Sequence, residues 1–144
     1  MDLIEQSKIA LATVFAFYLK AHYFHWNVEG VMFPYLHAFF GDIYEGTFEE
    51  VDGLAEHIRT LGAYAPGSLS RFSALSKISD ELNIPPADSM IQILKDDNGT
   101  VIDELTKTMK LADTAGKIGF SNYLQDRIDY HNKLAWMLRA TVEN

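Results

Sequence analysis

Apolar residues recur with helical spacing through almost the whole chain, and this limits the chain to an all-α fold. In the segment Leu3–Val28 they recur at alternating intervals of four and three residues, which places them on one side of a helix. The same rhythm continues in Phe33–Leu61, and again from about Asp88 to Ala115 and from about Ser121 to Val142. No segment reads convincingly as a strand. The sequence therefore predicts four long helices, packed as a four-helix bundle.

The connections between these segments predict how the bundle is threaded. Short turns join the first helix to the second and the third helix to the fourth, so each pair forms an antiparallel hairpin. Gly116 and Gly119 bracket the turn between the third and fourth helices. Residues 68–86 are too many for an ordinary loop, and we expect a short helix at Ser70–Ser76 within them. A connection of this length crosses the bundle, which is the ferritin-like arrangement. Because a chain of 144 residues has the typical length of one domain, we expect residues 1–144 to form a single domain.

Composition narrows the possible chemistry and the possible partners. The chain has no cysteine, which excludes disulfides, thiolate metal sites and cysteine nucleophiles. Its 20 acidic residues outnumber its 12 basic ones, for a formal net charge of −8, so it repels nucleic acid and attracts cations. The first residues carry acids where a signal peptide carries positive charge, and the longest strongly apolar run, Ile9–Leu19, is too short to span a membrane. We therefore expect a cytoplasmic protein that does not enter a membrane.

Candidate metal ligands concentrate in Lys20–Arg59, which contains four of the five histidines. His25 lies near the end of the first predicted helix and His37 one turn into the second, so the two side chains can approach each other across the turn. Asp52 and Glu56 are four residues apart, so both carboxylates project from one helix face. Taken singly, such carboxylates usually form a solvated surface, and such histidines usually cap a helix or fill a core. Together, imidazole and carboxylate are a common ligand set for iron and similar metals.

These four residues cannot close one metal site within a single chain. Asp52 follows His37 by 15 positions on the same predicted helix, a separation of roughly 22 Å at the rise of an α-helix. If all four bind one centre, two copies must meet head to tail about a two-fold axis, which generates two equivalent sites. The chain also lacks any Glu-x-x-His motif, the pattern with which other bundles hold two metals inside one subunit.

Several motifs resemble those of the Dps-like miniferritins. They are KAHYFHWNVEG at residues 20–30, LH at residues 36–37, DGLAEHIR at residues 52–59 and AWMLRA at residues 135–140. The resemblance spans nearly the whole chain. It implies that copies of the chain assemble as hollow dodecameric shells, oxidise Fe(II) with hydrogen peroxide or dioxygen, and store a ferric mineral.

The resemblance also assigns roles to individual residues. It implies a ferroxidase centre between two subunits, with His25 and His37 from one and Asp52 and Glu56 from the other. Asp52 is implied to be a direct, bridging ligand, and Glu56 the main carboxylate of the higher-affinity iron. Trp26, beside His25, either supplies electrons during peroxide reduction or is only an interface aromatic. Iron is the implied metal, and we expect other divalent cations such as Zn(II) to be able to occupy the site.

Three features depart from the family pattern. Some members carry an additional acid where this chain has Gly41, followed by Asp42, which predicts a second iron site that is weak or relies on water. Lys117 precedes the last predicted helix, where many members have acids that line an entry pore, and its positive charge argues against such a pore. The first predicted helix begins almost at once, without the lysine-rich tail of DNA-binding members, so we expect no DNA binding at physiological salt.

The sequence leaves other interpretations open. One is a non-enzymatic shell or interaction protein whose ferroxidase site has decayed, and a less favoured one is a DNA-coating protein. A stripe of acids on the second predicted helix is either a solvated outer face or a carboxylate surface that concentrates iron inside a shell; it consists of Glu45, Glu49, Asp52 and Glu56. His22 either orients a ligand or fills the core, and we interpret Trp136 as a packing residue.

Overall fold

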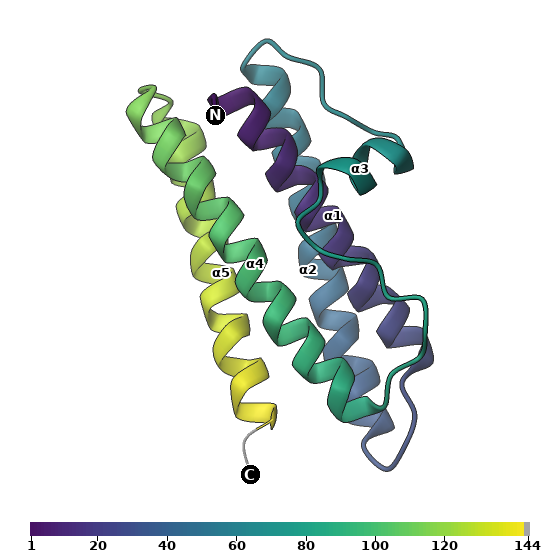
Figure 1. Ribbon diagram of the computed structural model, residues 1–144. Coiled ribbons are helices and arrows are strands. Elements are labelled where there is room, and N and C mark those ends of the chain that lie inside the picture. The colour runs from purple at the N-terminus through teal and green to yellow at the C-terminus, as the bar shows by residue number, and fades with distance from the viewer. Residues whose placement is uncertain (143–144) are drawn as a thin grey trace.

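The computed structural model describes residues 1–142 and contains five helices, with no strand, in that part of the chain (Figure 1). They are α1 (Leu3–Asn27), α2 (Phe33–Thr60), α3 (Leu69–Leu75), α4 (Ala87–Thr114) and α5 (Ile118–Val142). The four long helices form the bundle that the apolar periodicity predicts, and α3 is the expected short helix. Among the described residues, no helix is both long enough and apolar enough to cross a membrane.

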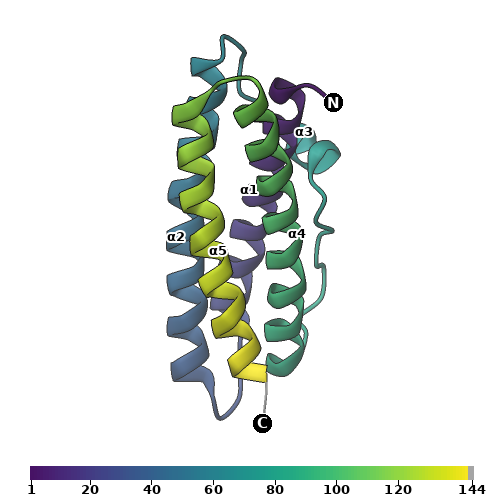
Figure 2. The same cartoon turned by 90° about the vertical axis from the view of Figure 1, so that its left-hand side faces the viewer.

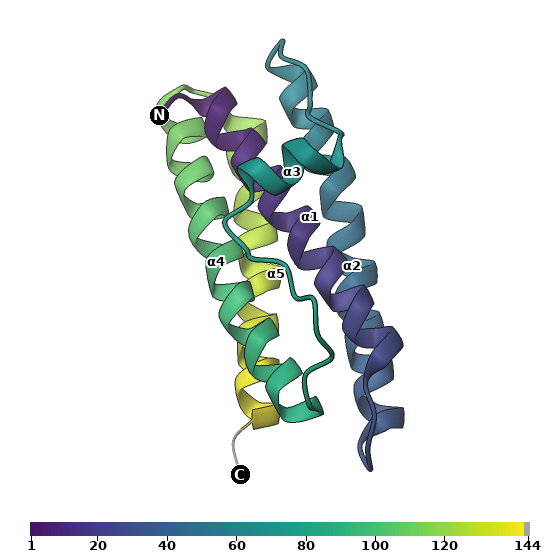
Figure 3. The same cartoon turned by 45° about the vertical axis from the view of Figure 1, so that its right-hand side comes forward.

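The helices form two antiparallel hairpins, α1 with α2 and α4 with α5, which a long crossover joins (Figures 1 and 2). Figure 3 shows this crossover, including α3, passing along α1 on its way to the start of α4. The ammonium group of Lys20 on α1 holds the crossover in place, because Nζ donates to the carbonyl oxygen of Ser79 at 2.6 Å and to Asp97 of α4 at 2.7 Å. The predicted ferritin-like arrangement is therefore confirmed.

The start of α5 is the largest difference from the predicted helix boundaries. This helix begins at Ile118 and not at Ser121, so Gly119 lies inside its first turn and does not bracket the preceding turn. The chain reverses direction between α4 and α5 with only one residue in the left-handed conformation, Gly116, whose φ is 69°. The N–H of Lys117 then donates to the carbonyl oxygen of Ala112 at 2.9 Å, which closes the end of α4 without a second glycine.

The core follows the predicted apolar stripes. Fully buried side chains from all four long helices meet along the bundle axis, among them Phe17, Phe24, Phe40, Leu54, Leu105 and Leu124. The interpretation of Trp136 as a packing residue is wrong for this chain, because its side chain is 55% exposed. Residues 134 and 138 point into the core, and a residue two positions from each lies on the other side of the helix.

Two tyrosines of α5 set its distance from α2, the helix that lies beside it in Figure 2. The hydroxyl oxygens of Tyr123 and Tyr130 rest against Gly53 and Gly46, where an added Cβ would come within 2.1 Å of them. Even alanine would therefore push either tyrosine out of place. The two glycines let the phenol rings fit between the helices and flank the polar cluster described below.

Candidate metal centre

His25 and His37 meet across the turn between α1 and α2. Their rings stack with centroids 3.8 Å apart and 15° between the planes. Nδ1 of His25 lies 2.6 Å from the carbonyl oxygen of His37, and Nδ1 of His37 lies 2.7 Å from the carbonyl oxygen of His25. A carbonyl oxygen only accepts hydrogen bonds, so each Nδ1 must donate. The two histidines therefore orient each other through reciprocal bonds from side chain to backbone.

These reciprocal bonds prepare both Nε2 atoms to bind a metal. In a neutral ring that carries its proton on Nδ1, the free lone pair is on Nε2. Metal-binding histidines almost always donate their other ring N–H to a carboxylate, a carbonyl or water, which fixes the ring. Both rings are only partly buried, so neither is sealed inside the bundle core. A pair of adjacent imidazoles with free, accessible Nε2 atoms can supply two nitrogen ligands to one cation.

The two candidate carboxylates lie elsewhere on α2. Asp52 and Glu56 are both exposed, and Asp52 is four helical turns beyond His37, or roughly 22 Å. Within residues 1–142, no group of three or more histidine, cysteine, aspartate or glutamate side chains lies close enough together to hold a metal ion. The structure thus brings together His25 and His37 but leaves Asp52 and Glu56 at the other end of the same hairpin.

His22 lies among aromatic side chains beside the histidine pair. Its ring stacks on Tyr44, with centroids 3.7 Å apart and 5° between the planes, and lies 4.1 Å from the ring of Trp26. Its Nδ1 is 3.0 Å from the hydroxyl of Tyr18. Burial lowers the pKa of His22, and the electrostatic influence of the neighbouring titratable ring of His25 lowers it further. These contacts support the packing interpretation of His22, while Trp26 keeps 58% of its surface exposed.

Gly41 lies directly against His25. An added Cβ at this position would be 3.3 Å from both Cε1 and Nδ1 of the imidazole, so an acid here would reach over the ring. The following residue, Asp42, does not replace it. Asp42 instead lines a groove between α2 and α5 together with Tyr130 and Lys133. The position at which some family members carry an acid therefore has no carboxylate in this chain.

The predicted acidic stripe is continuous and exposed on α2. Its members Glu45, Glu49, Asp52 and Glu56 are all open to solvent in the single chain. Glu45 and Glu49 also line the groove between α2 and α5. A negative surface of this kind attracts cations, and its exposure agrees with either of the two interpretations of the stripe.

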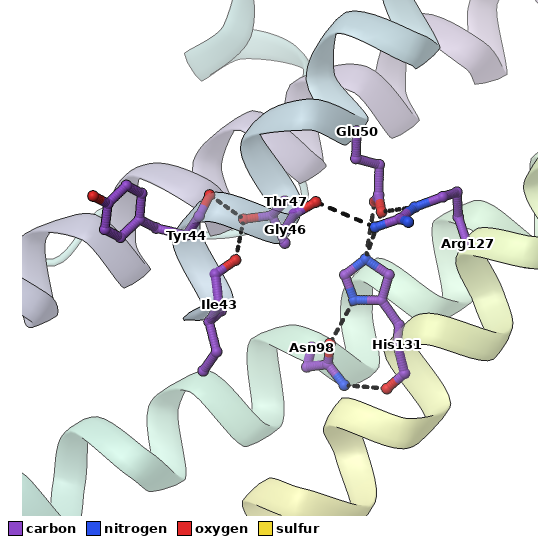
Figure 4. Close-up of polar contacts among 8 residues, drawn as sticks. All are labelled: Ile43, Tyr44, Gly46, Thr47, Glu50, Asn98, Arg127 and His131. Carbon is purple, nitrogen blue, oxygen red and sulfur yellow. Dashed lines mark hydrogen bonds and ion pairs between the residues drawn. The ribbon is translucent and has the colours of Figure 1, made fainter. Parts of the chain in front are cut away.

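Sequence reasoning missed a buried polar cluster between α2, α4 and α5 (Figure 4). We call it the core cluster; it consists of Glu50, Asn98, Arg127 and His131. The side chains of Glu50 and His131 are completely buried, and that of Arg127 is 17% exposed. Nε2 of His131 lies 2.9 Å and 3.1 Å from the two carboxylate oxygens of Glu50. Arg127 donates from Nε to the same carboxylate and from Nη2 to the carbonyl oxygen of Gly46.

A signal for this cluster was present in the sequence. Leu124, His131 and Leu138 are spaced seven apart, so the histidine occupies a core position of α5. Glu50 likewise lies between the buried residues Thr47 and Leu54, at helical intervals of three and four. Polar residues in register with a buried stripe indicate partners inside the bundle, because buried polar groups are almost always hydrogen-bonded.

Comparison with known proteins shows what this chain is similar to. The ferritin-like domain family matches residues 7–144. The DNA protection during starvation protein of Helicobacter pylori is 33% identical over 146 residues, covering 97% of this chain and 98% of that protein. The crystal structure of the Dps protein from Vibrio cholerae O1, described as a member of a broad superfamily of ferritin-like diiron-carboxylate proteins, has a TM-score of 0.94 at 31% identity, covering 98% of this chain and 89% of that one. For antigen TpF1 from Treponema pallidum the TM-score is 0.95 at 29% identity, with 99% and 92% covered.

Proposed function

This chain belongs to the ferritin-like family, among the Dps-like miniferritins, and from this premise we propose that it is a ferroxidase that oxidises Fe(II) and stores the ferric product in a hollow shell. The observation that carries the proposal is the reciprocal orientation of His25 and His37, which leaves both Nε2 atoms free. A decayed site in a non-enzymatic shell would have no need to keep two imidazoles in this orientation.

The proposed centre lies between two chains related by a two-fold axis. In an antiparallel dimer, His25 and His37 of one chain face Asp52 and Glu56 of the other, and the axis produces two such sites. Exposed apolar side chains on the α1–α2 hairpin support this contact. Phe48 is 56% exposed and packs against Tyr18, with ring centroids 5.0 Å apart. We propose that these dimers build a dodecamer, as the resemblance implies.

The ligand types suit the oxidation of Fe(II). Two neutral imidazoles hold Fe(II), and the carboxylates of Asp52 and Glu56 stabilise the more highly charged Fe(III), which makes loss of an electron easier. With hydrogen peroxide, two Fe(II) ions each give one electron, the O–O bond breaks, and two protons complete two water molecules. Dioxygen is the alternative oxidant. Because no carboxylate stands at Gly41, we propose that the second iron binds weakly and that Trp26 supplies an electron when only one iron is bound.

Fe(II) oxidation by the purified protein is the direct test of this proposal. Under anaerobic conditions with added peroxide, we expect absorbance from Fe(III) to rise faster than in a protein-free control. Glu56→Gln removes the charge of one proposed ligand and is expected to slow the reaction at least about tenfold, since lesser changes around metal ligands already have effects of this size. Asp103→Asn, which neutralises an exposed acid on α4, is the matched control and should keep the wild-type rate. A wild-type rate equal to the protein-free control would contradict the proposal.

DNA coating is a second candidate, because some relatives carry the name DNA protection during starvation protein. The charge of this chain argues against it. Each chain has a formal net charge of −8 and a sequence pI of about 4.9, so contact with phosphate groups is repulsive. We expect that plasmid DNA mixed with the protein at physiological salt migrates unshifted in a gel. Retention of the plasmid in the well would show that DNA binding occurs despite this charge.

A further inference from the structure

The imidazole of His25 fits into a notch on α2. His37, Gly41 and Tyr44 are spaced four and three residues apart, so they lie in a row on one face of that helix. The ring of His25 reaches from α1 onto the middle of this row, where a Cβ at Gly41 would lie 3.3 Å from its Cε1 and Nδ1. The glycine therefore leaves the space that the ring occupies, between His37 on one side and Tyr44 on the other.

The hydrogen bond of His25 does not by itself determine how its ring is tilted. Nδ1 donates to the carbonyl oxygen of His37, which fixes the position of that nitrogen. A hydrogen bond tolerates a range of donor angles, so the ring plane can still rock about this contact. The lone pair of Nε2 lies in the ring plane, and its direction changes with the tilt. Contacts on the faces and edges of the ring must fix the tilt.

Tyr44 closes the notch on the side away from His37. Its ring centroid lies 5.1 Å from that of His25, with 57° between the planes, which is within the range of favourable aromatic pairs. On the other side, the ring of His37 stacks on His25 with centroids 3.8 Å apart. The His25 ring is thus held between two side chains of α2.

Tyr44 is itself firmly supported. Its ring lies flat on that of His22, at 3.7 Å and 5°, and Nδ1 of His22 is 3.0 Å from the hydroxyl of Tyr18. Tyr44 is half-buried and packs against the hydrophobic core, and Figure 4 shows its side chain pointing away from the core cluster. Phe33, which stacks on the outer side of the histidine pair, is 40% exposed. The better-supported contact is therefore the one with Tyr44.

We propose that Tyr44 is a positioning residue for the metal centre, whose ring fixes the tilt of the His25 imidazole in the notch over Gly41 and so aims Nε2 before a metal binds. The inference rests on the proposed function only in treating His25 as a metal ligand. Because the contact joins two rings, it needs the aromatic ring of Tyr44 and not its hydroxyl group.

The first measurement follows the His25 ring in the full-length, metal-free protein. NMR of protein labelled with ¹⁵N-histidine detects the Nδ1–H of His25 at about pH 8, where an ordinary histidine with a pKa of ~6.5 is neutral; the signal is assigned by its loss in His25→Ala. We expect Tyr44→Leu to speed exchange of this proton with water about tenfold, relative to the backbone amide protons of α2. Tyr44→Phe should leave the exchange rate unchanged. An unchanged rate in Tyr44→Leu would overturn the proposal.

The second measurement tests whether the tilt matters for a metal. Co(II), whose visible absorption reports coordination, is titrated into the protein at a fixed chain concentration. Groups that orient metal ligands typically contribute at least tenfold to affinity, so Tyr44→Leu should weaken Co(II) binding about tenfold, whereas Tyr44→Phe should retain it. Tyr35→Leu is the matched control, because Tyr35 lies on the same helix, is 51% exposed and packs against Phe39. Equal Co(II) affinities of Tyr44→Leu and Tyr35→Leu would contradict the proposal.

A purely structural role for Tyr44 predicts a different pattern. Loss of packing alone would lower the urea midpoint of Tyr44→Leu but would leave both the relative exchange of the His25 proton and the Co(II) affinity of the folded protein unchanged. His22→Leu is a second variant, which keeps Tyr44 but removes the ring on which it rests. It should speed exchange of the same proton, and an unchanged rate would count against the proposed support.

The two measurements also separate this proposal from the ferroxidase function. A wild-type protein that bound no Co(II) would count against the proposed metal centre. The exchange of the His25 proton, which is measured without any metal, would still decide whether Tyr44 positions the ring.

Discussion

Mixing His25→Ala chains with Glu56→Ala chains is expected to restore about a quarter of the Fe(II)-oxidising sites, although either variant alone has none. The reason is the separation of the two half-sites within one chain. His25 and His37 are oriented at one end of the α1–α2 hairpin, and the exposed carboxylates of Asp52 and Glu56 lie roughly 22 Å away along α2. Each proposed centre must therefore combine halves from two chains.

The expected fraction follows from the two-fold symmetry. In a random equal mixture, about half of the dimers contain one chain of each kind. One of the two sites in such a dimer combines the intact histidines of the Glu56→Ala chain with the intact carboxylates of the His25→Ala chain. The other site carries both lesions and is inactive. About one site in four is then complete.

The measurement is the initial rate of Fe(II) oxidation after the two chains are unfolded together and refolded, or produced in the same cells. A mixture of His25→Ala with His37→Ala is the matched control, because both lesions then affect the same half-site and no pairing can restore it. Recovery in the first mixture but not in the second would support a shared centre. Equal rates in the two mixtures, or full activity of either variant alone, would contradict it.

The helices could be predicted from sequence because their cause is local. The alternation of intervals of three and four places whole helix faces in the core, and the buried residues of α1 and α2 follow the predicted stripes. The start of α5 was misplaced because two glycines suggested a wider turn, whereas a single residue with positive φ, Gly116, is enough to reverse the chain. Trp136 was misjudged because an aromatic residue near core leucines need not share their side of the helix.

In the candidate site, too, the local features could be predicted from sequence and the features that depend on helix packing could not. The approach of His25 and His37 could be predicted because both lie beside one short turn. Their reciprocal bonds to each other's carbonyl oxygen depend on how the two helices pack, which spacing alone does not reveal. The core cluster brings Glu50 together with Asn98 and His131, which follow it in the chain by 48 and 81 positions. Only the packed bundle brings such distant polar residues into contact, so the sequence could at most indicate that each needed a buried partner.

Replacing Glu50 with alanine is expected to lower the free energy of unfolding by about 3–5 kcal/mol, because removal of one partner from a buried ion pair leaves the charge of Arg127 uncompensated. Arg127 and His131 would then share the core with no carboxylate beside them. The pair itself need not add this much net stability, since desolvation offsets much of its attraction. The loss arises from what remains after the carboxylate is removed.

Urea denaturation at a fixed chain concentration measures this loss, with the concentration held constant because self-association stabilises the folded chain. Glu49→Ala is the matched control, since it removes the same side chain from the neighbouring, exposed position of α2 and should change stability by no more than about 0.5 kcal/mol. The double variant Glu50→Ala/Arg127→Met removes a buried cation together with the anion and should recover part of the loss, because one fewer charge is left unpaired. If Glu50→Ala and Glu49→Ala were equally stable, the carboxylate of Glu50 would not be compensating a buried charge.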